Sequence, residues 1–117
     1  MRVRPSSAIA MKTKEEAINA CLAFGDEYLD YPFDDNWALI RHNKSKKAFA
    51  MIFIREGLVW VNCKALPENN EIRRSVYDSV VPAYHMNKLH WSSLILDGSM
   101  SDEQIMPILE ESYDLTK

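Results

Sequence analysis

The chain has 117 residues and a formal net charge of −3, with 47% hydrophobic and 26% charged residues. This composition is typical of one globular domain and excludes a disordered chain. The longest apolar run, residues 48–54, has the length of a strand and falls far short of the ~20 apolar residues that a membrane-spanning helix needs.

The two cysteines, Cys21 and Cys63, lie inside apolar segments and far from a C-x-x-C spacing. Isolated cysteines of this kind are more often buried thiols than disulfide partners, and reducing compartments keep them reduced. We therefore expect buried, reduced thiols and a cytoplasmic protein.

Charge is distributed unevenly along the chain. Residues 41–88 carry nine Lys and Arg against four Asp and Glu, whereas the remainder carries five against thirteen. A basic region can orient a protein toward an anionic partner, although a solvated basic face is the more usual meaning of such a cluster. The charge pattern alone leaves both interpretations open.

Residues 1–11 show no periodic pattern and contain the sequence RPSS. We expect them to form a disordered lead. Neither an internal repeat nor a low-complexity tract follows, so residues 12–117 are predicted to form a single domain.

A helix and a loop are predicted next. Thr13 and Glu16 form a capping box, and the apolar residues that follow share one helical face until Gly25 ends the helix. Residues 26–36 contain Pro32 and an Asp-Asp-Asn cluster, which predicts an acidic loop with aromatic anchors.

Three strand-like runs cover residues 37–42, 47–54 and 58–64. Short polar turns at 43–46 and 55–57 separate them. Short connections between β-rich runs predict an antiparallel meander of hairpins.

The C-terminal half predicts two helices and a fourth strand. Residues 67–78 form the second helix, with Ile72 and Val76 facing the core. The strand covers residues 92–96, and a capping box at Ser101 opens the last helix. The order α-β-β-β-α-β-α predicts a two-layer α+β sandwich, in which helices pack on one face of an antiparallel sheet.

Metal binding and catalysis find little support in the residue types. His85 and His90 could join Cys63 or Asp97 around zinc, but their spacing matches no zinc site. Ser92 and Ser93 lie near His90 and Asp97 in the sequence, yet the chain has no Gly-x-Ser-x-Gly elbow, and its three glycines exclude a Gly-rich phosphate loop. We expect no enzyme activity, no metal and no cofactor.

The turn at residues 43–47 is the most basic stretch, with three lysines on a two-strand projection. Their ammonium groups could contact phosphates as point charges, although hairpin lysines often serve only solubility. Tryptophans could also stack on exposed bases, but packing within the sheet is their more usual role. The residues predicted to contact DNA are Lys44, Lys46, Lys47, Arg55, Arg73, Arg74 and Lys88.

Several short motifs share the pattern of one family. They are Pro32-Phe33, Lys47-x-Phe49-Ala50, the stretch from Cys63 to Glu68, Asp97-Gly98 and, most specific of all, the string PAYHMNKLHW at residues 82–91. From about Cys21 to Tyr113 the chain resembles the MmcQ/YjbR family, small bacterial proteins described as having a CyaY-like (frataxin-like) fold. Asp34 departs from the pattern, because the family often has glycine there.

The resemblance implies a binding function. The family is usually described as DNA-binding, with a double wing of β-hairpins, and the wings would coincide with the 43–47 and 55–57 turns. We expect a non-enzymatic monomer that binds DNA with low specificity, since no helix carries a clear base-reading set. The alternative is a protein- or ligand-binding module with a pocket at His85, Asn87 and His90.

The residues of the family motif are His85, Asn87, Lys88, His90 and Trp91. Tyr84 and Trp91 would pack, and Asn87 could take a turn position with positive φ. The histidines and Lys88 would be either structural hydrogen-bonding groups or part of a binding surface, and the residues alone leave both open.

Overall fold

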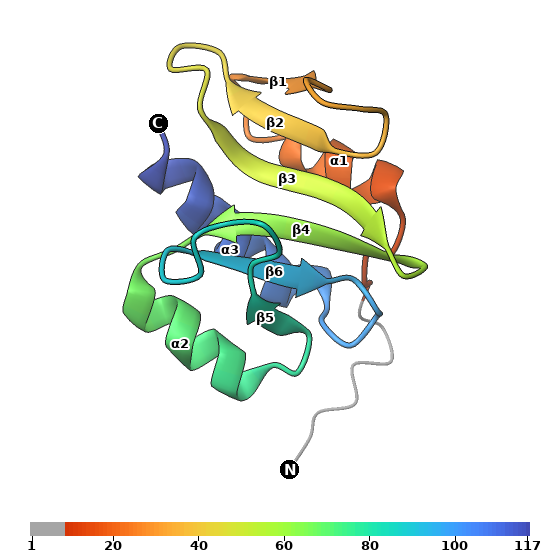
Figure 1. The fold of residues 1–117 in the computed structure, drawn as a ribbon, viewed down its shortest axis with the longest axis vertical. Helices are drawn as coiled ribbons and strands as arrows, with labels where there is room; N and C mark the ends of the chain where they lie inside the picture. Colours follow the sequence, from red (N-terminus) through yellow and green to blue (C-terminus); the bar gives the residue numbers. More distant parts are fainter. Residues whose placement is uncertain (1–8) are drawn as a thin grey trace.

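The computed structural model describes residues 9–117 (Figure 1). Its helices are α1 (Lys14–Cys21), α2 (Pro67–Val76) and α3 (Asp102–Leu115). Its strands are β1 (Glu27–Asp30), β2 (Ala38–His42), β3 (Ala48–Arg55), β4 (Leu58–Lys64), β5 (Val80–Pro82) and β6 (Trp91–Ile95). No helix in this range is long and apolar enough to cross a membrane.

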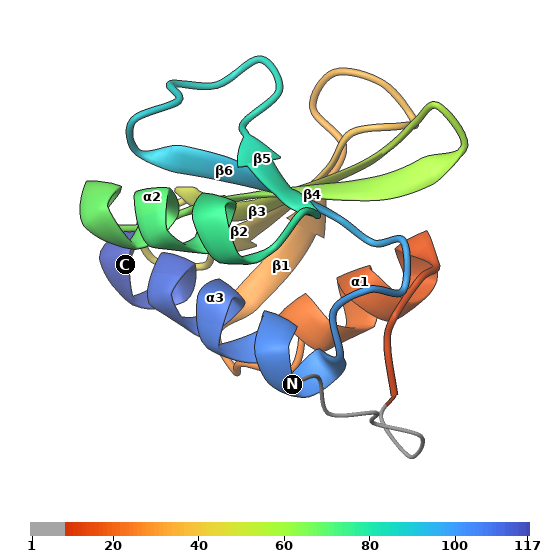
Figure 2. The same cartoon turned by 90° about the horizontal axis from the view of Figure 1, so that it is seen from below.

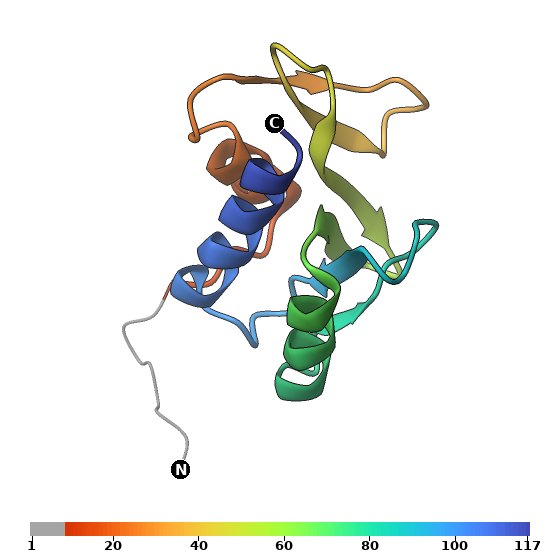
Figure 3. The same cartoon turned by 90° about the vertical axis from the view of Figure 1, so that its left-hand side faces the viewer.

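The six strands form one antiparallel sheet in the order β1-β2-β3-β4-β6-β5. The helices lie on one side of it, with α1 and α3 across the sheet and α2 beside β5 and β6 (Figures 2 and 3). The predicted two-layer α+β sandwich is therefore confirmed. The opposite face carries no helix of the described chain, and we call it the open face.

Two strands are absent from the predicted order. The stretch 26–36, predicted as a loop, contains β1, which pairs with β2 along one edge of the sheet. Its four residues, EYLD, are too few and too polar to show an apolar alternation. At the other edge, β5 has three residues and contains Pro82, a residue that sheets accept at their edges.

The N-terminal boundary also differs from the prediction. Residues 1–8 of the predicted lead lie outside the described range. Met11 belongs to the folded unit, since it is buried and its amide donates to Asp102 Oδ1 at 2.7 Å. The capping box at Thr13 is present, and α1 ends at Cys21, ahead of the stop predicted at Gly25.

The core lies between the helices and the sheet. Ile52, Leu94 and Leu109 are almost completely buried in it, and so are both cysteines, which are unpaired as predicted. Burial disfavours a thiolate and raises the pKa of both thiols, that of Cys63 to about 12. These thiols are protonated at neutral pH and fill space.

Helix α2 is oriented differently from the prediction. Ile72 and Val76, predicted to face the core, are 58% and 64% exposed. Polar side chains of α2 face the protein instead: Asn70 is buried, and Arg73 and Arg74 bond to other elements. The spacing of apolar residues could not predict this, because the partners of the polar side chains are distant in the sequence.

Candidate nucleic-acid interface

The loop at residues 83–90 carries the family motif and rises over the open face beside β5 and β6 (Figure 2). Ser93 Oγ donates to Asn62 Oδ1, Asn62 Nδ2 donates to the Tyr84 carbonyl at 2.9 Å, and the Tyr84 amide donates to Ser93 Oγ at 3.0 Å. Asn62 and Ser93 are fully buried. This closed set of buried hydrogen bonds fixes the start of the loop to the sheet.

A turn shapes the second half of the loop. Asn87 Oδ1 accepts from the amides of Leu89 and His90 at 3.0 and 3.1 Å, and the Asn87 carbonyl accepts from the Trp91 amide at 3.0 Å. The positive φ predicted for Asn87 is found at His85, whose φ is 63°. Asn87 therefore acts through its side chain, in an Asx turn.

Arg74 joins α2 to this loop. Its guanidinium donates to the carbonyls of Lys88 and Trp91 at 2.6 and 2.7 Å, and to Ser92 Oγ at 3.0 Å. Ser92 in turn donates to the buried Asn70 at 2.8 Å. The guanidinium is thus occupied by contacts within the fold.

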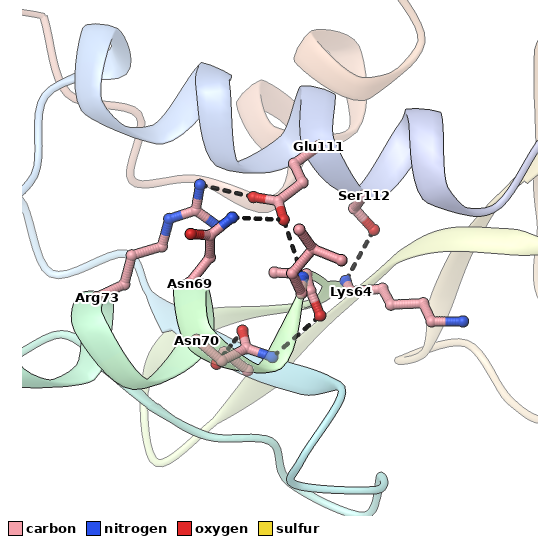
Figure 4. A network of polar contacts seen from close by, with 9 residues as sticks. Lys64, Asn69, Asn70, Arg73, Glu111 and Ser112 are labelled. Carbon is pink, nitrogen blue, oxygen red and sulfur yellow. Dashed lines mark hydrogen bonds and ion pairs between the residues drawn. The ribbon is translucent and has the colours of Figure 1, made fainter.

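Arg73 is occupied in a similar way, by an ion pair with Glu111 of α3 at 2.7 Å (Figure 4). Glu111 also accepts from the Leu66 amide at 2.9 Å and from Asn69 Nδ2 at 3.0 Å. Burial alone would raise the pKa of the Glu111 carboxyl, but these donors and the arginine charge lower it. Because both arginines hold the fold together, we leave them out of the candidate interface.

One end of the sheet gathers five lysines. The β2–β3 turn, the end of β4 and the start of β6 all lie at this end, because neighbouring strands run in opposite directions (Figure 1). Over residues 9–117, no ion pair includes any of these five side chains. We call the group the lysine end; its members are Lys44, Lys46, Lys47, Lys64 and Lys88.

The turn that carries three of these lysines is well anchored. Ser45 Oγ lies 3.5 Å from the Thr116 carbonyl, and Nε2 of the buried His42 lies 2.8 Å from Thr116 Oγ1. Lys46 has a φ of 67°, and its ammonium group lies 5.3 Å from the centre of the Tyr28 ring. The lysines project from an ordered turn, which lowers the entropy lost on binding a ligand.

Arg55, also predicted to contact DNA, lies away from the lysine end. The two turns predicted as wings stand at opposite ends of β3, a strand of eight residues and so ~26 Å long. The Arg55 guanidinium lies 4.7 and 4.3 Å from the ring centres of Trp60 and Tyr84, and 3.2 Å from the Glu56 carboxylate. The two wings therefore do not form one charged patch.

The motif side chains His85, Asn87 and His90 have separate surroundings. The His85 ring lies 3.9 Å from the Tyr84 ring and 6.3 Å from the Trp37 ring, between centroids. His90 is exposed, and Asn87 is committed to the turn. Over residues 9–117, no group of three or more His, Cys, Asp and Glu side chains could hold a metal ion.

Sequence reasoning missed Lys64 and Tyr28 as candidate interface residues. Lys64 ends a strand-like run, and its partner Trp91 comes from a strand that follows α2 and the motif loop. Tyr28 lies in the stretch predicted as a loop. The sequence around Lys64 and around Tyr28 does not indicate that these residues lie at the lysine end, because strand pairing between distant segments places them there.

The fold and these groups define a small two-layer α+β domain with a lysine end. The chain belongs to the YjbR family, whose model matches residues 22–115. It is 35% identical to the protein YjbR of Escherichia coli (strain K12), over 68% of this chain and 67% of that protein. It is 32% identical to the protein YyaQ of Bacillus subtilis (strain 168), over 75% of this chain and 84% of that protein. Both relatives are described only as uncharacterized proteins.

Two solved structures share the fold. A Deinococcus radiodurans protein with the domain DUF419 superposes with a TM-score of 0.77 at 28% identity, covering 90% of this chain and 78% of that one. A Pseudomonas syringae protein superposes with a TM-score of 0.78 at 25% identity, covering 90% of this chain and 99% of that one. These likenesses concern the fold and the family.

Proposed function

We propose that this protein binds DNA without sequence specificity, through phosphate contacts at the lysine end. The proposal rests on five lysines from three separate segments that lie at one end of the sheet. Over residues 9–117, none of them is ion-paired. Ammonium groups without acidic partners keep their charge for an anionic ligand, and a run of phosphates offers several charges at once. With a net charge of −3, the protein would bind through this local patch and against its overall charge.

The low specificity follows from the chemistry of the patch. Lysine ammonium groups contact phosphates as point charges, whereas bases are read by the paired donors of Arg, Asn and Gln. On α2, side chains of this kind at Asn70, Arg73 and Arg74 already bond within the fold. We therefore propose similar affinities for different sequences, and a binding role without catalysis.

The proposal includes a monomer and a cytoplasmic location. The buried, unpaired thiols support the location. The pocket at His85, Asn87 and His90 is a weaker candidate, because those side chains have separate surroundings. The likeness to frataxin-like folds stays a prediction, and no part of the proposal depends on it.

Fluorescence anisotropy with a short labelled duplex of mixed sequence tests the proposal. Each neutralised phosphate contributes about −0.9 to the slope of log Kobs against log salt, so three to five lysines give a slope between about −2.7 and −4.5. We expect this slope to be the same for duplexes of different sequence. Absence of binding at low salt would contradict the proposal.

Charge reversal locates the contact. Changing Lys44, Lys46 and Lys47 together to glutamate should weaken binding to all sequences alike and flatten the salt dependence. For a control matched in charge, the single changes Lys47→Glu and Lys12→Glu are compared, since Lys12 is exposed and lies beside Gly98, beyond the far end of β6. Equal losses of affinity in the two single variants would mean that overall charge, and not the lysine end, drives binding.

A further inference from the structure

A row of side chains crosses the sheet at the lysine end. Tyr28 pairs with Arg41 and Arg41 with Ala48, while Lys64 pairs with Trp91. The β3–β4 register pairs Ala50 with Cys63, and the β2–β3 register shifts between Ile40 and Arg41. Ala48 is therefore offset by one position from Lys64, and the five residues form a staggered row across β1, β2, β3, β4 and β6. Four strand spacings make the row ~19 Å long.

The β4 and β6 members of the row point to the open face. Trp60 contacts the Tyr84 ring and Asn62 donates to the Tyr84 carbonyl, so both face the motif loop. Lys64 shares their face, because alternate residues of a strand point the same way. Trp91 faces the same side as its cross-strand partner Lys64.

The β1 and β2 members point to the same face. In β2, Ile40 belongs to the core and the buried His42 contacts Tyr113 of α3, so Arg41 between them faces away from the helices. Tyr28 is the cross-strand partner of Arg41 and shares its face.

The row combines flat rings with cations. Trp91 is partly exposed and takes part in no aromatic pair over residues 9–117. At the other end of the row lies the partly exposed Tyr28. Arg41 is paired with Asp30 at 2.9 Å, which leaves the neighbouring lysines as the unpaired charges. Ala48 carries only a methyl group, so it adds neither a ring nor a charge to the row.

We infer that the preferred ligand of the lysine end is single-stranded nucleic acid, with bases stacked on Trp91 and Tyr28 and phosphates at the lysines. This inference rests on the proposed function and names its substrate class. In a duplex the bases stack on each other, so a protein surface reaches phosphates and base edges but no base faces, whereas a single strand offers phosphates and free base faces together. A surface with cations alone would not distinguish the two.

Three labelled probes of equal length test the inference at one salt concentration: oligothymidine, an abasic strand with the same phosphates, and a duplex. We expect oligothymidine to bind about tenfold more tightly than the abasic strand, since one stacked base is worth roughly that factor or more. We also expect it to bind more tightly than the duplex. Equal affinity for oligothymidine and the abasic strand would overturn the inference.

Tryptophan variants locate the stacking. Oligothymidine should quench the intrinsic fluorescence of the protein, and the quenching should be lost in Trp91→Phe but kept in Trp37→Phe, which changes a tryptophan stacked on Phe53. Trp91→Phe keeps an aromatic ring for packing and stacking, so it should retain most of the affinity, whereas Trp91→Ala should lose about tenfold for oligothymidine and nothing for the abasic strand. Equal quenching in both phenylalanine variants would overturn the assignment to Trp91.

The two proposals fail in different ways. If all three probes bind equally with a steep salt dependence, phosphate binding stands and the single-strand inference is wrong. If none binds at low salt, both are wrong.

Discussion

At the scale of single residues, Asn62 and Ser93 are buried polar side chains that bond to the backbone of one residue, the carbonyl and the amide of Tyr84. Their residue types fit several roles: Ser93 also lies near His90 and Asp97 in the sequence, as a catalytic serine would. The hydrogen bonds assign it to the motif loop. Nothing in the sequence predicts this, because the three residues come from β4, the loop and β6.

Replacing Asn62 with leucine should destabilise the protein. The Tyr84 carbonyl would lose its donor and Ser93 would lose its acceptor in a buried place, which costs about 2–3 kcal/mol. Urea unfolding followed by circular dichroism measures this cost. Ser75→Ala is the control, since Ser75 is exposed and bonds only within its own helix, and it should change stability by no more than about 0.5 kcal/mol.

We expect His42 to make the stability of the fold depend on pH. Burial lowers the pKa of its imidazole below the usual value, so the folded protein holds the neutral ring more strongly than the unfolded chain does. Protonation therefore favours unfolding, and stability is lost as the pH falls below the unfolded pKa, near 6.5.

The test is urea unfolding between about pH 7.5 and 5.5 for the native protein and His42→Gln. Glutamine keeps an amide that can bond to Thr116 Oγ1 but does not titrate. The native protein should lose more stability than the variant as the pH falls. Parallel pH curves for the two proteins would show that His42 does not contribute.

At the scale of elements, the sequence predicts the strands and helices that carry their own signal, either a pattern of apolar residues or a capping box. β2, β3 and β4 alternate or run apolar, and capping boxes mark the starts of α1 and α3. The edge strands β1 and β5 are missed because they are short and half solvated. The orientation of α2 is missed because its inward face is polar, and only its partners on α3 and β6 explain that.

Arg74, like Asn70, joins α2 to the motif loop and β6, and the structural role of Arg74 can be separated from DNA contact. Arg74→Gln removes donors to the carbonyls of Lys88 and Trp91 and should cost about 1–3 kcal/mol of stability. The salt slope of DNA binding should stay the same, because the guanidinium is occupied by hydrogen bonds within the fold.

The combination of unfolding and anisotropy measurements decides the role of Arg74. If Arg74→Gln reduced the magnitude of the salt slope by about 0.9 and left stability unchanged, Arg74 would be a phosphate contact after all. Arg73→Gln is a parallel case, since it would leave Glu111 without its ionic partner.

At the scale of the whole molecule, the sheet has two unlike ends. The lysine end carries lysines that form no ion pair within residues 9–117, together with the rings of Tyr28 and Trp91. At the opposite end, Arg55 packs on Trp60 and Tyr84, and its charge is shared with Glu56. The count of basic residues along the sequence does not separate these two ends, because residues 41–88 contribute side chains to both.

Two substitutions that each remove one positive charge distinguish the ends. Lys64→Gln should weaken DNA binding and lower the magnitude of the salt slope by about 0.9, although the sequence gives no reason to select this lysine. Arg55→Gln should leave affinity and slope unchanged, because its guanidinium is held on aromatic rings ~26 Å along β3 from the β2–β3 turn. If Arg55→Gln lowers the slope as much as Lys64→Gln does, DNA contacts both ends of β3, and the double-wing arrangement describes this protein better than a single lysine end.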